Sequence, residues 1–190
     1  MKKWNFIDKF IASFRYSIVK KYIVKDSVVA DIGCGRECEF LLSHKDIIKK
    51  GYGFDFRIKD KVIDNIEFIN NKNIAKLPLK KNSVDTVFML AVLEHLDDPH
   101  TVLLDVFRVL KKGGNLVMTV PTPFAKPILE FLAFKLHIIN EDEIREHKDY
   151  YDRKKIQKLV SELNKTIKVH LNVYKYFEFG VNGFIVITKE

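Results

Sequence analysis

The chain has 190 residues, of which 47% are hydrophobic, and a formal net charge of +8. This length supplies one well-buried core and is short of the size at which chains usually divide, so we expect a single domain over residues 1–190. The charge would attract acidic partners, but the lysines are spread along the chain in pairs, which favours a solvated basic surface over a nucleic-acid footprint.

Residues 1–25 are expected to contain an amphipathic basic helix. Apolar side chains recur at three- and four-residue spacing from Phe6 to Tyr22, with lysine and arginine between them. The favoured interpretation is a helix that packs its apolar face on the domain, and the alternative is peripheral contact with a membrane surface or a partner. The start of the chain does not resemble a secretory signal, and no apolar stretch reaches the roughly 20 residues of a transmembrane helix. We therefore expect a cytoplasmic protein without a transmembrane segment.

Short apolar runs then alternate with helical patterns. Strands are predicted at 27–32, 51–56, 66–70, 84–90 and 115–120, and helices at 39–50 and 97–114. Asp98 should cap the second helix, with Pro99 in its first position and Gly113 at its end. Such alternation predicts an α/β fold, a parallel sheet with helices on both faces. Residues 167–179 and 183–189 are expected to form an antiparallel hairpin at one edge.

The stretch VVADIGCGREC, residues 28–38, carries a strand into a glycine turn. Gly33 and Gly35 permit a tight turn and close approach of the backbone to a ligand. A dinucleotide fingerprint would need a third glycine where Cys38 stands. The turn also carries three carboxylates, which disfavour a pyrophosphate and are tolerable around a cofactor that is positively charged and has no phosphate: Asp31, Glu37 and Glu39.

Cys34 and Cys38 are the only cysteines. Without a second Cys or His pair at zinc-ligand spacing, they predict neither a disulfide framework nor a metal centre.

Several ordered motifs resemble the class I S-adenosylmethionine-dependent methyltransferases, most closely the type 11 subfamily. They are VVADIGCG, GYGFD, NIAKLPLKKNSVDTVFML and AVLEHLDDPHTVLLDVFRVLKKGGNLVMTVP, and they span residues 28 to about 120. Their order and spacing are far more specific than the glycine turn alone. The resemblance implies a Rossmann-like sheet and S-adenosylmethionine as the cofactor.

Carried over residue by residue, the resemblance also implies a cofactor site. Asp31 would organise the turn or its ligand, the backbone of Gly33, Cys34 and Gly35 would lie against the methionine and ribose, Asp55 would hold the ribose hydroxyls, Asn73 and Ile74 the adenine, and Leu90 and Ala91 the methionine end. The sequence departs from the family where Glu37 stands near the usual third glycine. This raises the question of how closely the following helix can approach the cofactor.

Residues 121–152 are too long for a plain connection and predict a lid-like insertion. Its phenylalanines could line an apolar pocket or pack into the core: Phe124, Phe131 and Phe134. His147 and Tyr150 are the candidate catalytic residues, because a histidine can take a proton from a hydroxyl acceptor at neutral pH; the alternative is that His147 only caps or packs. Asp152 could cap the next helix. Glu94 and His95 are interpreted as structure on the cofactor side.

The predicted function is methyl transfer to a small molecule or a biosynthetic intermediate. Nucleic acid is disfavoured because LAVLEHL replaces the Asn- or Asp-Pro-Pro-aromatic motif of base amino-methylating enzymes, and neither cysteine follows a proline. Two alternatives stay open, a binding module that holds S-adenosylmethionine without catalysis and a nicotinamide-dependent oxidoreductase. The sequence predicts no oligomeric state.

Overall fold

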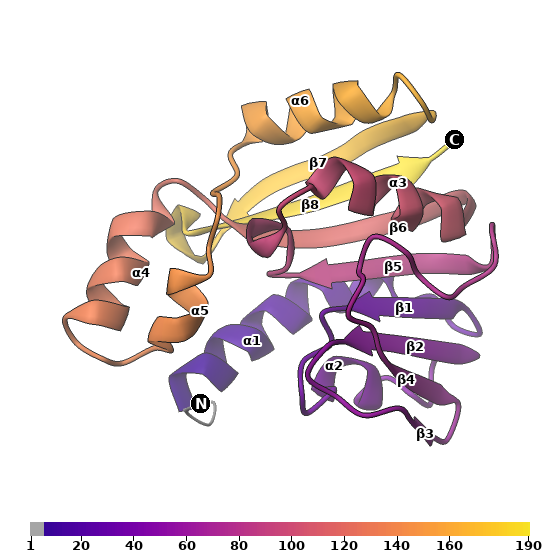
Figure 1. The fold of residues 1–190 in the computed structure, drawn as a ribbon, viewed down its shortest axis with the longest axis horizontal. Helices are drawn as coiled ribbons and strands as arrows, with labels where there is room; N and C mark the ends of the chain where they lie inside the picture. The colour runs from indigo at the N-terminus through magenta and orange to yellow at the C-terminus, as the bar shows by residue number, and fades with distance from the viewer. Residues whose placement is uncertain (1–5) are drawn as a thin grey trace.

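A mixed sheet forms the centre of the computed structural model, which describes residues 6–190, with side chains from residue 12 onward except that of Glu143 (Figure 1). Over these residues the sheet has eight strands in the order β3-β4-β2-β1-β5-β6-β8-β7. They are β1 (Val28–Ile32), β2 (Lys50–Asp55), β3 (Lys61–Ile63), β4 (Ile66–Asn70), β5 (Val84–Leu90), β6 (Leu110–Pro121), β7 (Val169–Phe177) and β8 (Asn182–Lys189).

The middle of the sheet is parallel and both edges are antiparallel. Strands β4, β2, β1, β5 and β6 pair in parallel, whereas β8 pairs antiparallel with both β6 and β7. The predicted α/β fold with its C-terminal hairpin is therefore confirmed. The sequence did not predict β3, which pairs antiparallel with β4 at the opposite edge. The order reverses between β1 and β5, and ligands of such sheets bind at the carboxyl ends of the strands beside that point.

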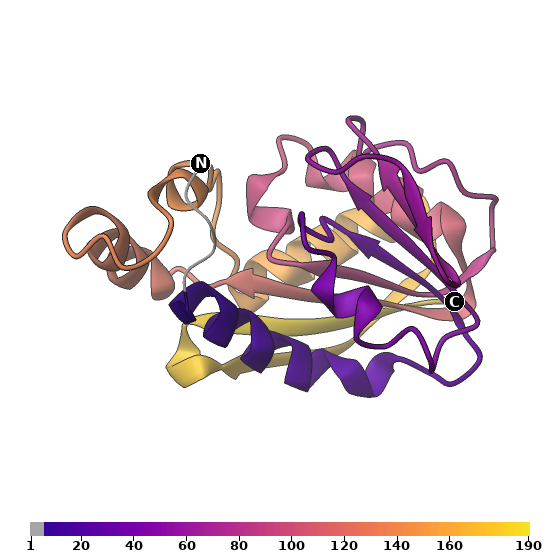
Figure 2. The same cartoon turned by 90° about the horizontal axis from the view of Figure 1, so that it is seen from below.

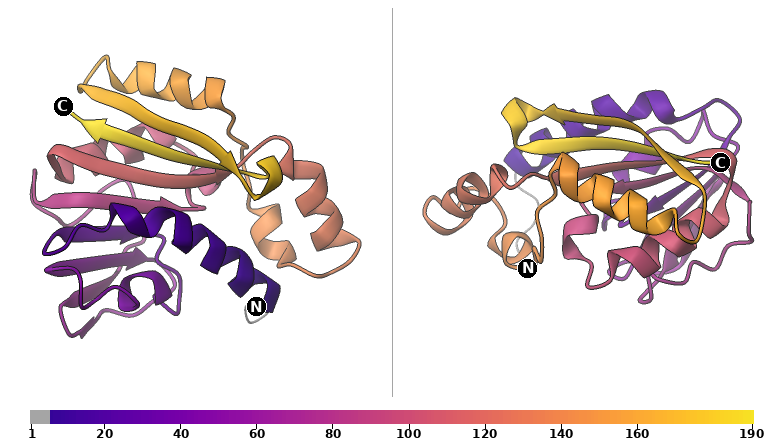
Figure 3. Two further views of the ribbon diagram at one scale, coloured as in Figure 1. Left: turned by 180° about the vertical axis from the view of Figure 1, so that it is seen from behind. Right: turned by 90° about the horizontal axis from the view of Figure 1, so that it is seen from above.

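Helices cover both faces of the sheet (Figures 2 and 3). One face carries α1 (Phe6–Val19), the turn η1 (Lys20–Tyr22) and α2 (Glu39–Leu42); the other carries α3 (Pro99–Val109) and α6 (Arg153–Leu163). Each face has its own apolar cluster. Val29, Phe88 and Val117 point towards α1 and α2, while Ala30, Val87 and Leu116 point towards α3 and α6. This alternation along each strand fixes which face each neighbouring residue takes.

The described side chains of α1 support the packing interpretation of the N-terminal helix. Ala12 and Val19 are buried, and Tyr16 stacks on Phe40 of α2 with ring centroids 5.2 Å apart. The backbone carbonyl of Tyr22 accepts a hydrogen bond from Thr86 of β5. The predicted apolar positions Phe6, Ile7, Phe10 and Ile11 lie outside the described side chains.

Two helix predictions need correction. The expected helix at 39–50 is only α2, four residues long. Ser43 and His44 both place side-chain atoms on the carbonyl of Phe40, at 2.9 and 2.7 Å, and such local bonds compete with helix continuation. The second helix ends at Val109, and Gly113 sits with a positive φ of 74° in an irregularity of β6 instead of at the helix end.

The segment 121–152 projects beyond the carboxyl ends of the parallel strands (Figure 1). It contains α4 (Ala125–Phe134) and α5 (Glu141–Arg145). Among the described residues, no helix combines the length and the apolar character that crossing a bilayer requires.

Candidate functional site

The glycine turn after β1 is anchored to the neighbouring strand. The backbone N–H groups of Gly33 and Cys34 donate to the carbonyl of Phe54 in β2, at 2.7 and 3.1 Å. Gly33 has a φ of 75°, and a Cβ there would lie 2.5 Å from the Val92 side chain. Gly35 has a φ of 70°, but a Cβ there would meet nothing within 4 Å. Gly33 is therefore required by packing, whereas Gly35 borders open space that a ligand can enter.

Asp55 ends β2 beside this turn, with only 2% of its side chain exposed. Its Oδ2 accepts a hydrogen bond of 3.0 Å from the Gly35 N–H. Arg57 donates from its backbone and its guanidinium, with Nε 3.0 Å from Oδ1 and Nη2 2.9 Å from Oδ2. Burial alone would raise the pKa of Asp55, but the bonds from Arg57 and Gly35 lower it below its usual value. Asp55 is thus a buried, ionised acceptor, and two of its bonds come from a side chain that can move.

Asp31 lies one strand away in β1 and is 3% exposed. Burial raises its pKa well above the usual range, and Cys38 and Asp55 raise it further. Tyr16 of α1 is close enough for Asp31 to contribute to the raised pKa of its hydroxyl. Asp31 is therefore buried two residues before the turn, in a form that holds its proton more firmly than an ordinary aspartate.

The structure also shows where Glu37 and its neighbours in the turn lie. Glu37 and Glu39 are exposed, so their carboxylates face solvent. Cys38 is buried in a left-handed conformation with a φ of 55°, and its Sγ lies 3.9 Å from that of Cys34. The four-residue helix α2 begins directly after Cys38, so no long helix follows the turn.

The residues predicted to contact the adenine and the methionine lie at or just after the ends of β4 and β5. Asn73 is exposed in the loop after β4, where its Oδ1 accepts a bond of 3.2 Å from the Ala75 N–H; Ile74 beside it packs against the core. Leu90 ends β5, and Ala91 follows with a φ of 55° and donates its N–H to the carbonyl of Thr119. Asn73 and Ile74 thus follow the carboxyl end of β4, and Leu90 and Ala91 lie at the carboxyl end of β5.

The segment 121–152 leaves much of its apolar surface exposed. In α4 the buried residues are both alanines, Ala125 and Ala133. Phe124 is 61% exposed and Phe131 54% exposed, so core packing does not hold for these two residues. Phe134 is half-buried, with the Arg145 guanidinium 4.7 Å from its ring centroid.

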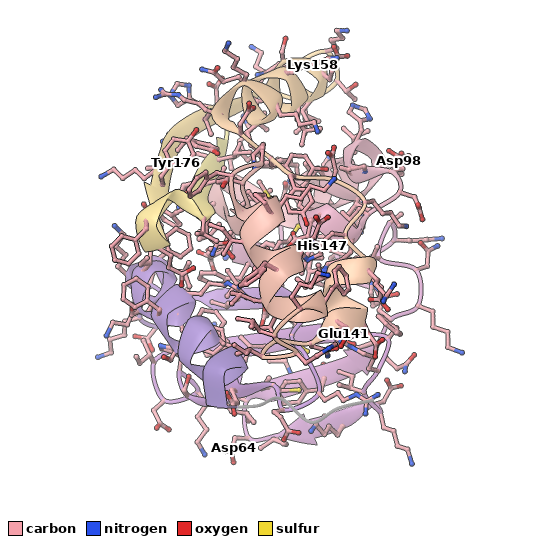
Figure 4. The ribbon with its side chains drawn as sticks, turned by 90° about the vertical axis from the view of Figure 1, so that its left-hand side faces the viewer. Asp64, Asp98, Glu141, His147, Lys158 and Tyr176 are labelled. Carbon is pink, nitrogen blue, oxygen red and sulfur yellow. The ribbon has the colours of Figure 1, made fainter. Side chains whose placement is uncertain are left out.

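The end of the segment docks on the turn that follows β5. That turn, η2 (Leu93–His95), offers the carbonyl of Glu94, which accepts a bond of 2.8 Å from the Lys148 N–H. His95 Nδ1 lies 3.3 Å from the carbonyl oxygen of Glu146. Figure 4, which looks onto this end of the molecule, shows His147 near the middle of the view.

His147 and Tyr150, the candidate catalytic residues, contact each other. Nδ1 of His147 is 3.3 Å from the Tyr150 hydroxyl, and its ring packs edge-on against that of His95 with centroids 4.9 Å apart. Burial lowers the pKa of His147 to about 4, with contributions from His95 and Arg15, and burial also lowers the pKa of His95. Both imidazoles are therefore uncharged at neutral pH. An ordinary histidine has a pKa near 6.5, and partial desolvation of the site is the main reason for the lower pKa of His147.

Sequence reasoning missed two features of this region. It assigned no role to Arg57, although an arginine two residues after Asp55 is a signal for such a pair. It also did not place Glu94 and His95 beside His147, since no local pattern links residues so far apart in the chain.

A Rossmann-like sheet with a glycine turn after β1 and a buried carboxylate at the end of β2 is the arrangement of a class I methyltransferase. Residues 30–118 match the family model of the methyltransferase domain. The resemblance predicted from the motifs, with S-adenosylmethionine as the family's cofactor, is confirmed.

Two named enzymes are similar to this chain in sequence. The chain is 28% identical over 118 residues to a tRNA U34 carboxymethyltransferase of Aliarcobacter butzleri, covering 56% of this chain and 38% of that protein. It is 37% identical over 84 residues to a demethylmenaquinone methyltransferase of Lactococcus lactis, covering 44% of this chain and 32% of that one. The chain thus spans less than half the length of these relatives.

A solved S-adenosylmethionine-dependent methyltransferase of Mesorhizobium loti has the same fold. It superposes with a TM-score of 0.68 at 13% identity, over 91% of this chain and 96% of that chain. At this identity the likeness concerns the fold alone.

Proposed function

We propose that this chain binds S-adenosylmethionine at the carboxyl ends of β1, β2 and β5 and transfers its methyl group to an acceptor held beneath residues 121–152. The observation that carries the proposal is the open Gly33–Gly35 turn, joined to the buried Asp55 carboxylate by the bond from Gly35. It lies within a segment that matches the methyltransferase domain family.

Each part of the proposed site has a stated task. The turn lies against the methionine and ribose, Asp55 accepts the ribose hydroxyls once the Arg57 side chain has moved, Asn73 and Ile74 flank the adenine, and Leu90 and Ala91 border the methionine end. The sulfonium supplies an electrophilic methyl group, so the main task of the chain is to align the acceptor and keep water out.

For the acceptor we propose a small molecule or a biosynthetic intermediate with an apolar body. The exposed Phe124 and Phe131 favour apolar contact, and His147 with Tyr150 offers polar atoms at the base of the same segment. Because His147 is a weak base, it serves better to bind and orient a hydroxyl than to remove its proton unaided. We assign the catalytic contacts to His147 and Tyr150 on this basis.

RNA is a second candidate acceptor. The net charge of +8 and the similarity to tRNA-modifying enzymes support it, while the scattered lysines argue against a dedicated RNA surface. The methyl-labelling experiment described below distinguishes these two acceptors.

Calorimetry with S-adenosylmethionine and S-adenosylhomocysteine tests cofactor binding, with a nicotinamide dinucleotide as the negative control. We expect binding and thermal stabilisation by the first two only. No heat and no stabilisation at millimolar concentration would refute the proposal, and binding of the dinucleotide alone would favour the oxidoreductase alternative.

Incorporation of isotope-labelled methyl groups into cell extract then identifies the acceptor class. We expect label in the small-molecule or lipid fraction, resistant to ribonuclease. Label in RNA supports the second candidate, and tight cofactor binding without label in any fraction supports a non-catalytic binding module.

A further inference from the structure

Three potential metal ligands meet at the base of the lid-like segment. Glu94 and His95 lie in η2, directly after β5, and His147 follows α5. One ligand atom from each residue lies within 4.8 Å of the others. Two of the residues come from the sheet side and one from the inserted segment, so the group exists only while that segment is docked.

The hydrogen bonds around the two imidazoles leave the same nitrogen of each ring available. The carbonyl of Glu146 can only accept, so Nδ1 of His95 carries the proton and Nε2 holds the lone pair. Nδ1 of His147 lies 3.3 Å from the Tyr150 hydroxyl, and in the tautomer that donates to this hydroxyl Nε2 holds the lone pair. Metal-binding histidines usually have this arrangement, with one nitrogen held by a carbonyl or a polar group and the other facing the ion.

The electrostatics also suit a cation. Glu94 is 1% exposed and brings a carboxylate into contact range of the two imidazoles. The nearby cations have counterions of their own, since Lys148 pairs with Asp97 and Arg57 pairs with Asp55. Arg15 also lies near enough to lower the pKa of His147, so one positive charge opposes the binding of a cation here.

We propose that Glu94, His95 and His147 bind a divalent transition-metal cation, with Zn²⁺ as the best match. Two imidazole nitrogens and one carboxylate oxygen suit Zn²⁺ and similar ions, whereas Mg²⁺ and Ca²⁺ prefer oxygen ligands throughout. Ligands of a tetrahedral zinc lie roughly 3.3 Å apart, so the three side chains close in slightly around the ion.

Such an ion has two consequences. It ties residues 141–152 to η2, because His147 belongs to the former and Glu94 and His95 to the latter. Three protein ligands also leave a position for water or for an oxygen of the acceptor. The second consequence rests on the proposed methyl transfer, whereas metal binding itself does not.

The site conflicts with the sequence expectation that no metal centre is present. That expectation considered only cysteine and histidine spacing along the chain. Here two ligands come from η2 and one from the end of the inserted segment 121–152. These are far apart in the chain, so no local spacing rule detects them.

Metal binding is tested on the full chain, free of any polyhistidine tag and treated with a chelator. Zn²⁺ is titrated by calorimetry and Co²⁺ by visible absorption, with His95→Ala and His147→Ala as test variants. His137→Ala removes a histidine elsewhere in the same segment, and Cys38→Ser removes a competing thiol. We expect about one equivalent bound by the parent and by both controls, and at least tenfold weaker binding in each test variant.

A thermal melt with and without Zn²⁺ gives a second readout. We expect the ion to raise the melting temperature of the parent and to leave that of folded His147→Ala unchanged. No binding at millimolar Zn²⁺, parent-like affinity in His147→Ala, or loss of binding in Cys38→Ser would each overturn the proposal. S-adenosylhomocysteine binding by the metal-free chain is measured separately, so failure of the cofactor proposal is distinguishable.

Discussion

Replacing Arg57 with alanine should strengthen cofactor binding, because the Arg57 side chain occupies the carboxylate that the proposal assigns to the ribose. Its Nε and Nη2 make two of the bonds to Asp55, at 3.0 and 2.9 Å. The bonds from the backbone N–H groups of Gly35 and Arg57 can persist when a ligand binds. The cofactor must therefore displace the guanidinium and nothing else at this carboxylate.

The size of the expected change in cofactor affinity follows from the solvent exposure of the Asp55–Arg57 ion pair. A hydrogen bond to a charged group contributes about 1.5–3 kcal/mol when buried. The Asp55 side chain is 2% exposed but that of Arg57 is 31% exposed, so solvent weakens the pair. We take about 1 kcal/mol for the displaced contact, which lowers the apparent affinity about fivefold. Arg57→Ala should therefore bind about fivefold more tightly, and Asp55→Ala about ten- to a hundredfold more weakly.

The assay is calorimetry with S-adenosylhomocysteine at fixed ionic strength. Lys45→Ala is the matched control, because it also removes one positive charge and breaks an ion pair, that with Asp64 on the surface. We expect parent-like affinity for this control. Threefold or greater weakening in Arg57→Ala would refute the reasoning and show that Arg57 itself contacts the cofactor. An unchanged dissociation constant in Asp55→Ala would show that the ribose is held elsewhere.

Three further predictions concern stability and turnover. Gly33→Ala should lower the free energy of unfolding in urea by about 3 kcal/mol and Gly35→Ala by about 1–2 kcal/mol. Both positions have a positive φ, but only a methyl group added at Gly33 overlaps a neighbouring side chain; equal losses would contradict this. Burial would raise the pKa of Asp105, but the hydrogen bonds from Arg108 and from the Leu77 N–H lower it below its usual value. The stabilisation that this carboxylate gives the fold is therefore present above about pH 4, and it is lost as the pH falls through the lowered pKa of the folded state. Asp105→Asn should cost about 1–2 kcal/mol at pH 7 and little at pH 2, and a pH-independent cost would refute it. Once an acceptor is known, His147→Ala should lower turnover about 10²-fold with unchanged cofactor affinity, because the acceptor hydroxyl is no longer oriented; a change of only a few-fold removes His147 from catalysis.

The sequence alone determined the features that depend on near neighbours. Apolar runs and turn residues predicted the parallel strands, and two helix starts were identified from single side chains. Asp98 accepts a bond of 3.1 Å from the Thr101 N–H, and Asp152 accepts one of 2.8 Å from the Lys155 N–H. These contacts join residues three apart, so local chemistry is sufficient to specify them.

Other local expectations were wrong where a competing contact decided the outcome. Ser43 and His44 bind the Phe40 carbonyl and the helix stops there, although the apolar pattern continues. Leu110 leaves the helix because it pairs with Val84 of β5. The energy of a strand partner brought from elsewhere in the chain outweighs the helix propensity of a few residues.

Only the tertiary structure decided how the candidate site is composed. It placed the Arg57 guanidinium on Asp55, brought His147 from the inserted segment against His95, and left Phe124 and Phe131 exposed. It also lowered the pKa of both histidines by burying them. Contacts between distant segments and the desolvation they cause depend on how the sheet and its long connection pack together. That packing is a property of the whole chain, and no local pattern encodes it.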